Sequence, residues 1–431
     1  MRRSVAQNAF WIIACKAAQA LMALVIGMIT ARYLGPSNYG LISYASSIVA
    51  FLVPIMKLGF NGTLVQEIII DPENEGKVMG TSLLLCFIAS LASIVGILSF
   101  TMIFNAGETE TIIVCFLYSL TLTFQAGEML QYWFQAKLLS KYPSIISLLA
   151  YACVSVYKIY ILVTGKNIRW FAVTHTIEAA IISGLLIAIY GRVCEKKLAV
   201  SFALGKQLLS RSRYYISSGL MMVLFQQTDR VMLKLMCGAE ETGYYSAAYT
   251  CVSMSAFVFA AVIESIRPSI LKSKKNASGE YEKGLLLLCS IVIYLSLGQG
   301  VVMTLLSKPM IFLMFGTSYA PSAGVLRILV WYAIFGYIGM ARNVWILAEE
   351  KQKYLWKLNL AGAIANVACN ALLIPLLGAN GAAISTVLSQ FLAEYAVCFL
   401  VKPMRPIGVI MNKSFNPRHL MQFVKSYVKQ C

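Results

Sequence analysis

Charged residues are scarce in this sequence. Only 13% of its 431 residues are Asp, Glu, Lys or Arg, whereas 59% are hydrophobic and the mean hydropathy is +0.73. An ordinary soluble domain carries about twice that share of charge. Acidic residues are the scarcest, since 18 of them face 36 basic residues and leave a net charge of +18. This composition excludes a soluble globular protein.

Signals for ATP hydrolysis, metal binding and disulfides are also missing. A phosphate-binding loop ending at Gly205 and Lys206 would need glycine where Val200 stands, so an ATP-driven pump is excluded. His175 has no Cys, Asp or Glu cluster at ligand spacing, and we expect neither a metal nor a cofactor. Most of the 11 cysteines lie inside apolar runs, where cysteine acts as a small hydrophobic residue.

Long apolar windows dominate the chain instead. Windows of about 20 apolar residues are typical of transmembrane helices. They predict an all-α integral membrane protein with about twelve such helices, which leaves no room for a soluble catalytic domain. The predicted spans are residues 10–31, 39–60, 79–104, 111–135, 143–164, 170–190, 214–236, 244–270, 284–306, 323–346, 355–377 and 381–401.

The basic residues mark the orientation of these spans. Most Lys and Arg fall in alternate loops, and few, such as Arg32, Lys166 and Lys308, fall in the others. Because positive loops are retained in the cytoplasm, both termini are predicted to be cytoplasmic. The basic charge is thereby explained without a nucleic-acid partner.

Two internal matches predict a repeat. Residues 35–45 align without a gap on residues 238–248, with four identities, and Trp133 to Tyr142 aligns on Trp345 to Tyr354. Each match joins the same pair of spans in the two halves. The chain is therefore predicted to form two six-helix bundles related by a pseudo-two-fold axis along the membrane normal. The predicted parts are a first lobe at 1–190, a cytoplasmic linker at 191–213, a second lobe at 214–402 and a basic cytoplasmic tail at 403–431.

Ten charged residues fall inside the predicted spans. A charge at the bilayer centre costs about 2.5–3.5 kcal/mol, so such residues usually face a bundle interior or a hydrated cavity. Five cations are expected to line a cavity that attracts a diphosphate or an acidic sugar: Lys16, Lys158, Arg230, Arg267 and Arg342. Five acids are candidates for ion or proton coupling: Glu128, Glu178, Asp229, Glu264 and Glu394. Local pairing and hydrogen bonding between helices remain alternatives, above all for Asp229 with Arg230 and for Glu264 with Arg267.

Several motifs together suggest a family. Residues 31–40, 132–136, 229–233, 243–248 and 366–383 resemble, in order and spacing, the Wzx-type O-antigen and exopolysaccharide flippases of the multidrug/oligosaccharidyl-lipid/polysaccharide exporter superfamily. The resemblance implies a MATE-like fold in a bacterial inner membrane. It also implies transport of an undecaprenyl-diphosphate-linked oligosaccharide to the outer leaflet, by alternating access, for O-antigen, capsule or exopolysaccharide synthesis. The implied partners are that lipid-linked oligosaccharide, membrane lipids and a polymerase or export complex. None of the ten charged residues is carried over from the family.

Three alternatives remain open. A drug antiporter of the same superfamily would favour an acidic cavity, whereas basic and acidic membrane charges are equal in number here. Lipid II flippases look like chains of fourteen membrane helices, whereas this sequence predicts twelve. A membrane glycosyltransferase, polymerase or ligase would need a long outward loop or an acidic catalytic motif, so we expect a transporter and not an enzyme.

Overall fold

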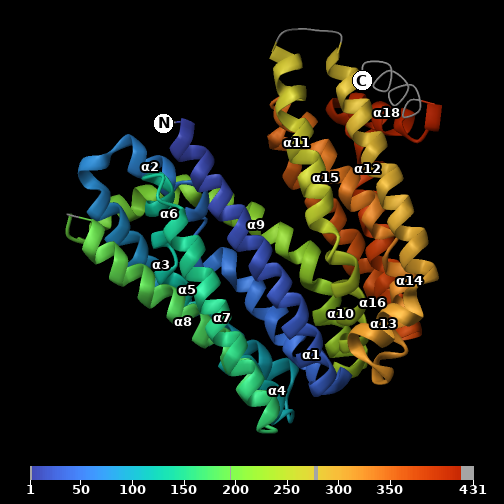
Figure 1. The fold of residues 1–431 in the computed structure, drawn as a ribbon, viewed down its shortest axis with the longest axis horizontal. Helices are drawn as coiled ribbons and strands as arrows, with labels where there is room; N and C mark the ends of the chain where they lie inside the picture. Colours follow the sequence, from blue (N-terminus) through green and yellow to red (C-terminus); the bar gives the residue numbers. More distant parts are fainter. Residues whose placement is uncertain (1, 195, 276–279, 419–431) are drawn as a thin grey trace. The chain divides into compact units, whose positions relative to one another are not determined.

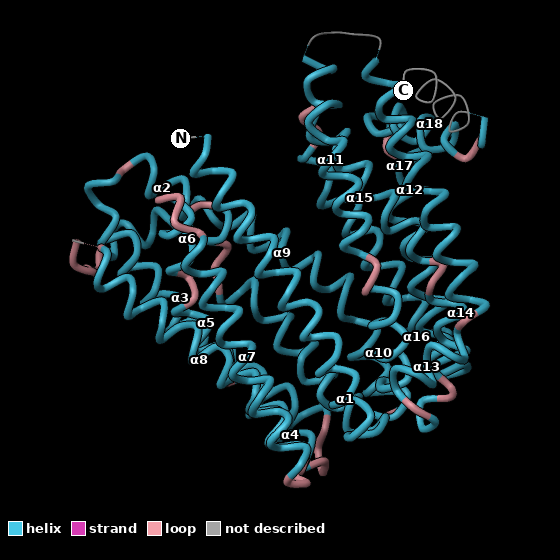
Figure 2. The backbone as a smooth tube through the Cα atoms, viewed as in Figure 1, coloured by secondary structure: helices cyan, strands magenta, loops and turns pink. Residues whose placement is uncertain are grey.

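The predicted all-α class is confirmed. The computed structural model describes residues 2–194, 196–275 and 280–418, and within these ranges the chain is helical with short turns and no strand (Figure 2). The chain divides into two compact units, Met1–Gln227 and Thr228–Cys431. Residues 419–431 of the predicted basic tail lie outside the described ranges.

The apolar helices confirm an integral membrane protein. In the described part, nine helical segments are long and apolar enough to cross a membrane. Two of them, Cys15–Met56 and Gln352–Leu400, have 42 and 49 residues and each contains a glycine with non-helical angles, so each covers two predicted spans. The predicted span 214–236 has no counterpart among the nine. The count of twelve stays a prediction.

The first unit is a helical bundle in which α1 contacts α7 and α4, while α8 contacts α7, α5 and α4 (Figure 1). One predicted span is divided into α4, α5 and α6 by turns near Leu120 and Glu128. The elements are α1 (Arg2–Met56), η1 (Phe60–Gly62), α2 (Leu64–Ile70), η2 (Pro72–Asn74), α3 (Glu75–Phe104), α4 (Thr109–Ser119), α5 (Thr121–Gly127), α6 (Leu130–Ala136), α7 (Lys141–Val163), α8 (Ile168–Val193) and the first part of α9 (Phe202–Cys237).

The second unit is another bundle, in which α12 contacts α11, α15 and α18, and α14 contacts α10 and α16 (Figure 1). The segment η5 is a π-helical turn that continues α16. After the end of α9, the elements are α10 (Ala239–Ser253), α11 (Ala256–Lys275), α12 (Glu280–Leu305), α13 (Ser307–Phe315), η3 (Thr317–Tyr319), α14 (Ser322–Leu329), α15 (Tyr332–Ala348), η4 (Gln352–Tyr354), α16 (Leu355–Gln390), η5 (Phe391–Ala396), α17 (Val397–Leu400), η6 (Lys402–Met404) and α18 (Arg405–Ser414).

The backbone repeats between the two units. Gly35 has φ 72° and ψ 171°, and Gly238, at the aligned position 203 residues later, has φ 94° and ψ 178°. This conformation is essentially restricted to glycine, because a Cβ would clash with the backbone. Positive φ angles recur in three further pairs of turns: Gly107 and Gly316, Leu138 and Glu350, and Gly165 and Gly378. The conformations support the internal repeat that the sequence predicts.

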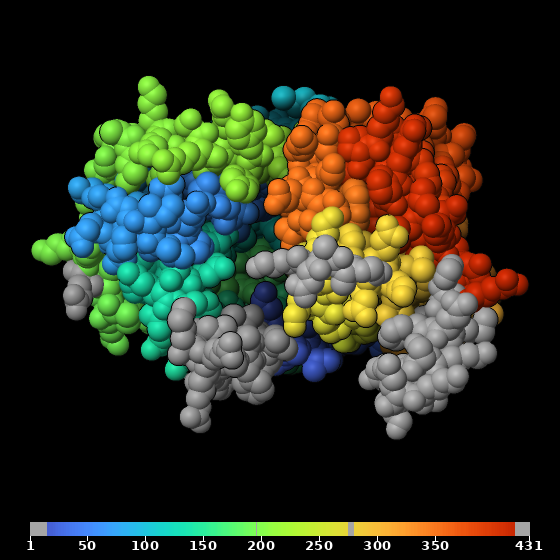
Figure 3. All heavy atoms as spheres, turned by 90° about the horizontal axis from the view of Figure 1, so that it is seen from above, coloured from blue at the N-terminus to red at the C-terminus, as the bar shows by residue number. Residues whose placement is uncertain are grey.

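Helix α9 crosses the boundary between the units. Its first part is held to the first unit by an ion pair of Arg211 with Glu67 and by a hydrogen bond of 3.0 Å between the Ser212 and Thr63 hydroxyls. Figure 3 looks onto this end of the first unit, where α2 (blue) lies beside the start of α9 (light green). The division between the units falls at Gln227, within this helix, and the linker at 191–213 stays a prediction.

Candidate functional site

Asp229 is the centre of a buried polar cluster in the second unit. Its side chain is only 3% exposed. Asn366 and Asn370 donate to its Oδ1 at 2.8 and 2.7 Å, and Tyr245 and Thr386 donate to its Oδ2 at 2.7 and 3.0 Å. Four donors thus stabilise the carboxylate in a site from which water is almost excluded.

The chemistry of this cluster suits a small cation or a proton. Each donor group around Asp229 also carries an oxygen atom, and the Oδ1 atom of Asn370 is buried without a hydrogen-bond partner among the described residues. Because the two ends of an amide are assigned from the hydrogen-bond network, turning both Asn side chains would surround the carboxylate with oxygen atoms. Hard cations prefer such oxygen ligands. No cluster of three or more His, Cys, Asp or Glu suited to a metal ion occurs in the described ranges.

Arg342 lies in a buried ion pair and does not line a cavity. Its side chain is among the largest that are fully buried, with 1% exposure, and its Nη2 atom lies 2.7 Å from Oε2 of Glu394. It also donates to the carbonyl oxygens of Ala393 and Glu394 at 3.1 and 3.2 Å, within the π-helical segment η5. These contacts occupy Nη1 and Nη2 of Arg342, while its Nε is buried without a hydrogen-bond partner among the described residues. The ion pair also commits Glu394 to a structural contact.

Arg230 lies in an aromatic stack of the second unit. Its guanidinium lies 4.5 Å from the centre of the Tyr249 ring, and the Tyr332 ring stacks on Tyr249 at 6.0 Å with an interplanar angle of 3°. Tyr245, which donates to Asp229, also stacks on Tyr249, and the two ring centres are 6.3 Å apart. All except Tyr245 are half-buried. The guanidinium and the Tyr faces are therefore ordered by contact with one another.

Lys158 in α7 is half-buried in the first unit. Its ammonium lies 5.9 Å from the centre of the Tyr151 ring. Glu178 in α8 interacts with it electrostatically, but within the described residues no carboxylate lies at ion-pair distance. His175 stacks against Tyr118 at 4.7 Å, as expected for a histidine that serves packing.

Glu128 and Lys57 lie within electrostatic reach of the pair formed by Lys158 and Glu178. Glu128 interacts electrostatically with Lys57 at the end of α1 and with Glu178. We call Lys57, Glu128, Glu178 and Lys158 the charge chain of the first unit. Across the resolved ranges, its members have no direct ion pair or side-chain hydrogen bond with one another. Their hydrogen-bonding capacity is thus open to water, protons or a ligand.

The remaining predicted site residues lie on exposed surfaces. Arg267 and Glu264 form an ion pair of 2.9 Å along α11, so the local pairing that their spacing predicted is confirmed. Lys16 is exposed on α1. Within the second unit, Arg230, Arg267 and Arg342 therefore have different contact partners. Lys158 and Arg230 are both half-buried, and each faces a tyrosine ring of its own unit.

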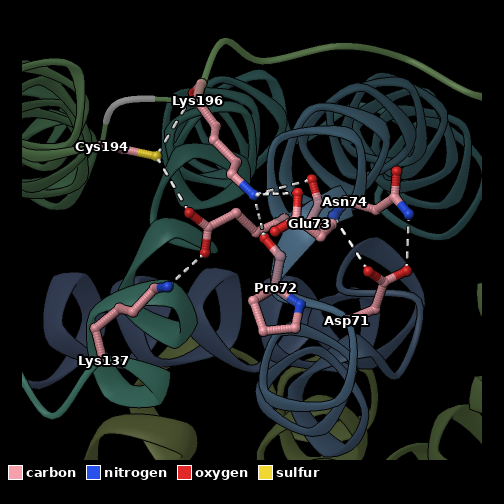
Figure 4. Close-up of polar contacts among 8 residues, drawn as sticks. Asp71, Pro72, Glu73, Asn74, Lys137, Cys194 and Lys196 are labelled. Atoms are coloured by element: carbon pink, nitrogen blue, oxygen red, sulfur yellow. Dashed lines mark hydrogen bonds and ion pairs between the residues drawn. The ribbon is translucent and has the colours of Figure 1, made fainter.

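A second cluster, which local spacing in the sequence does not reveal, surrounds Glu75 at the start of α3 (Figure 4). Its carboxylate is buried and pairs with Lys137 at 2.7 Å, and the thiol of Cys194 lies 3.9 Å from its other oxygen. Lys196 donates to the carbonyl oxygens of Pro72 and Glu73 at 2.8 and 3.1 Å. These contacts fasten the segment after α8 to the turn between α2 and α3.

The second unit has a charged cluster at the matching place. Glu349, 212 residues after Lys137, accepts from Lys274 at 2.6 Å and from Tyr281 at 3.0 Å. Burial acts to raise the pKa of Glu349, but the hydrogen bonds from Lys274 and Tyr281 and the charges of Lys274 and Lys351 outweigh it. The pKa of Glu349 is therefore lower than the usual value of a glutamate.

Solved structures with the same fold are membrane transporters. A multidrug resistance MATE family transporter of the MOP superfamily, in an inward-facing conformation, has a TM-score of 0.70 at 14% identity and covers 91% of this chain and 96% of its own. The lipid II flippase MurJ, in an inward closed conformation, has a TM-score of 0.71 at 14% identity over 97% and 92%. A MOP superfamily transporter from Pyrococcus furiosus has a TM-score of 0.62 at 14% identity over 94% and 96%. The predicted MATE-like fold is confirmed.

Sequence comparison identifies the family. No curated protein matches the chain. A family model described as "Polysaccharide biosynthesis protein" matches residues 5–274, which is more than half of the chain. This match shows that the chain, whose apolar helices adopt a MATE-like fold, belongs to the polysaccharide biosynthesis protein family.

Proposed function

We propose that this protein is a flippase that carries an undecaprenyl-diphosphate-linked oligosaccharide from the cytoplasmic to the outer leaflet of a bacterial inner membrane. It would serve O-antigen, capsule or exopolysaccharide synthesis and would work by alternating access. Membership of the polysaccharide biosynthesis protein family supports the substrate class. The MATE-like fold supports transport as the activity.

The observation that carries the proposal is the environment of Lys158. This lysine is half-buried, its ammonium faces the Tyr151 ring, and no described carboxylate neutralises it at contact distance. A charged ammonium that is half-buried in a membrane-spanning helix costs free energy, and an anion bound during the transport cycle would offset that cost. The diphosphate of a lipid-linked oligosaccharide supplies that anion, whereas the cationic drugs of an antiporter would be repelled.

The stack around Arg230 supplies a second anchor of suitable chemistry. A guanidinium binds phosphate oxygens through paired N–H donors. The faces of Tyr249 and Tyr332 carry the negative part of the ring quadrupole, which attracts the polarised C–H groups of a sugar. Arg230 and these rings would bind the diphosphate and its first sugar.

Asp229 is the proposed site of ion or proton coupling. Its carboxylate is directly linked to Tyr245, and the Tyr245 ring stacks on Tyr249 in the Arg230 stack. A cation or proton that arrives at Asp229 must displace or turn the hydroxyl of Tyr245 and thereby disturb the stack. Occupancy of the ion site and of the substrate site would be coupled through this one side chain.

The decisive test is flipping of a purified lipid-linked oligosaccharide by the protein in proteoliposomes. Lys158→Gln removes the charge and leaves a polar side chain that is one atom shorter. We expect transport to fall by about ten-fold or more, the size of one lost charged hydrogen bond. Arg267→Gln is the matched control, because Arg267 already pairs with Glu264 on an exposed surface.

Two results would refute the proposal. Transport by Lys158→Gln at the rate of the unaltered protein would remove the role of this lysine. Efflux of a cationic dye by the unaltered protein, without flipping of any lipid-linked sugar, would establish a drug antiporter. Flipping of lipid II in preference to other lipid-linked oligosaccharides would replace the proposed substrate by lipid II.

A further inference from the structure

A groove lies between α3 and the start of α9 in the first unit. One wall consists of Leu84, Leu85 and Ile88 of α3, and the other of Val200, Phe202 and Leu209. Its volume is about 280 Å³, and Lys206 is the one charged side chain among its lining residues. The groove is therefore an apolar channel with a cation at its rim.

The backbone of the segment before α9 is fixed along this groove. The amide of Ala199 donates to the carbonyl of Gly76 at 3.2 Å, and the amide of Ser201 donates to the Thr81 hydroxyl at 3.0 Å. Gly80 permits the approach, since a Cβ there would lie 2.3 Å from the carbonyl oxygen of Ala199. Val200 is thus held between two anchored residues, and the groove is formed before any ligand arrives.

The base of the groove is set by Gly205. A Cβ at this position would lie 3.2 Å from Cγ2 of Thr81 and 3.3 Å from Cδ1 of Leu85, which is tight contact. Here α9 therefore comes close to α3. From Thr81 to Ile88 the groove runs along α3 for about 10 Å, at 1.5 Å per residue.

The walls leave hydrocarbon-like surface uncovered. Ile88 is 54% exposed and Val200 is 50% exposed, although both are large apolar side chains. In a membrane protein such surface is covered by the hydrocarbon chain of a lipid. A chain lying in the groove would bury both walls at once.

The charges at the end of the groove favour an anionic headgroup. Lys77 shares a face of α3 with Thr81, Leu84 and Ile88 by its helical spacing, and Lys206 lies on the rim. Among the described carboxylates at this end, Glu67 pairs with Arg211, Glu73 with Lys196 and Glu75 with Lys137, and Asp71 accepts hydrogen bonds from Asn74. Over the described part of this end, Lys77, Lys197 and Lys206 have no carboxylate at ion-pair distance.

We propose that this groove is a binding site for an anionic phospholipid. One acyl chain lies between α3 and α9 along Leu84, Ile88 and Val200, and the phosphate group meets Lys77, Lys197 and Lys206. By the positive-inside pattern of the sequence, the lipid belongs to the cytoplasmic leaflet. The groove shares no lining residue with the contacts of Lys158 or Arg230, and the proposal does not depend on which substrate is transported.

Native mass spectrometry of the full-length protein in detergent tests the site. Phosphatidylglycerol and phosphatidylcholine with identical acyl chains are added at equal concentrations, and the lipid retained by each variant is counted. The unaltered protein should retain phosphatidylglycerol preferentially. Lys206→Gln should weaken this retention by about five-fold, which corresponds to ~1 kcal/mol for one lysine at an anionic lipid surface. Lys353→Gln, in the second unit, is the control for loss of a charge.

Val200→Trp fills the groove and should abolish the preference. Val301→Trp is its matched control, because Val301 is 49% exposed on α12 and Val200 is 50% exposed. Circular dichroism verifies that each variant is folded, and Lys206→Gln keeps the proposal testable if Val200→Trp does not fold. Equal retention of both phospholipids by the unaltered protein would overturn the proposal. Displacement of phosphatidylglycerol by an equimolar polyprenyl phosphate would overturn it as well, in favour of the tail of a transported lipid.

Discussion

The two units differ in how they treat charge within their helices. In the second unit, Asp229 has four hydrogen-bond donors and Arg342 is sealed against Glu394. In the first unit, Lys158 and Glu178 act on each other only at a distance. The two units share a repeated backbone, but their charged side chains therefore have different environments. Arg342 and Glu394 of the second unit are committed to each other, whereas Lys158 and Glu178 of the first unit have no ion pair in the described residues.

The largest expected effect concerns the sealed ion pair. Arg342→Ala leaves the Glu394 carboxylate buried and unpaired, so we expect the free energy of unfolding to fall by about 3–5 kcal/mol. Lys158→Gln, in the first unit, should change it by less than about 1 kcal/mol. Denaturant unfolding in mixed micelles, followed by circular dichroism, measures both. A double variant, Arg342→Met with Glu394→Leu, should recover most of the loss; equal losses for Arg342→Ala and Lys158→Gln would refute the contrast between the units.

The next effect concerns hydrogen bonds around Asp229. Asn370→Ala removes donors to Asp229 and Asn366, and we expect a loss of about 1.5–3 kcal/mol in the free energy of unfolding. Ser155→Ala, in the first unit, removes a buried hydroxyl that has no hydrogen-bond partner in the described ranges and should cost less than about 0.5 kcal/mol. The same unfolding assay compares them. If Ser155→Ala costs as much as Asn370→Ala, the Ser155 hydroxyl must make a stabilising hydrogen bond, and the contrast between the units would be wrong.

The third prediction tests what the units share. Gly35→Ala and Gly238→Ala should each lower the free energy of unfolding by about 1–2 kcal/mol, because both glycines adopt a conformation that a Cβ disfavours. No atom from elsewhere in the described chain lies within 4 Å of the added methyl at either position, so the cost comes from the local backbone. Gly184→Ala, equally open but within the helix α8, should instead stabilise by about 0.5–1 kcal/mol. Unequal costs at Gly35 and Gly238, by thermal unfolding, would argue against equivalent kinks.

The smallest effect depends on pH. The pKa of Glu349 is lower in the folded protein, so its contribution to stability is complete above the usual glutamate pKa of about 4.3 and is lost as the pH falls through the folded value. Glu349→Gln should cost about 0.5–1 kcal/mol at pH 7. The difference from the unaltered protein should shrink below about pH 4.3. Unfolding curves between neutral and acidic pH measure it, and a difference that grows with acid would reverse the assigned sign.

Local patterns in the sequence predicted those parts of the molecule that depend on local spacing. Aligned segments predicted a repeat whose first positions, Gly35 and Gly238, share a backbone conformation, and the separation of three residues offered the pairing of Glu264 with Arg267 as one alternative. Contacts across long separations were not predictable in this way. Arg342 meets Glu394 52 residues later, and Asp229 meets Asn370 141 residues later, because tertiary packing of different helices brings them together.

The sequence also did not reveal where α9 changes unit. A polar segment after α8 reads as a flexible linker, yet backbone hydrogen bonds to Gly76 and Thr81 fasten it to α3. Glycines at positions 76 and 80 are the signal that could have indicated a close approach, since each lies under a carbonyl oxygen of this segment. Their partners cannot be identified from spacing along α3 alone.

The continuity of α9 limits how the protein can move. The helix runs from Phe202 to Cys237 without a break, although the chain passes from one unit to the other at Gln227. A flexible loop between the units would let each unit move independently. A continuous helix whose first part is held to one unit would resist such motion. Any motion of one unit against the other would therefore have to bend α9 near Gln227 or break the contacts of Arg211 with Glu67 and of Ser212 with Thr63.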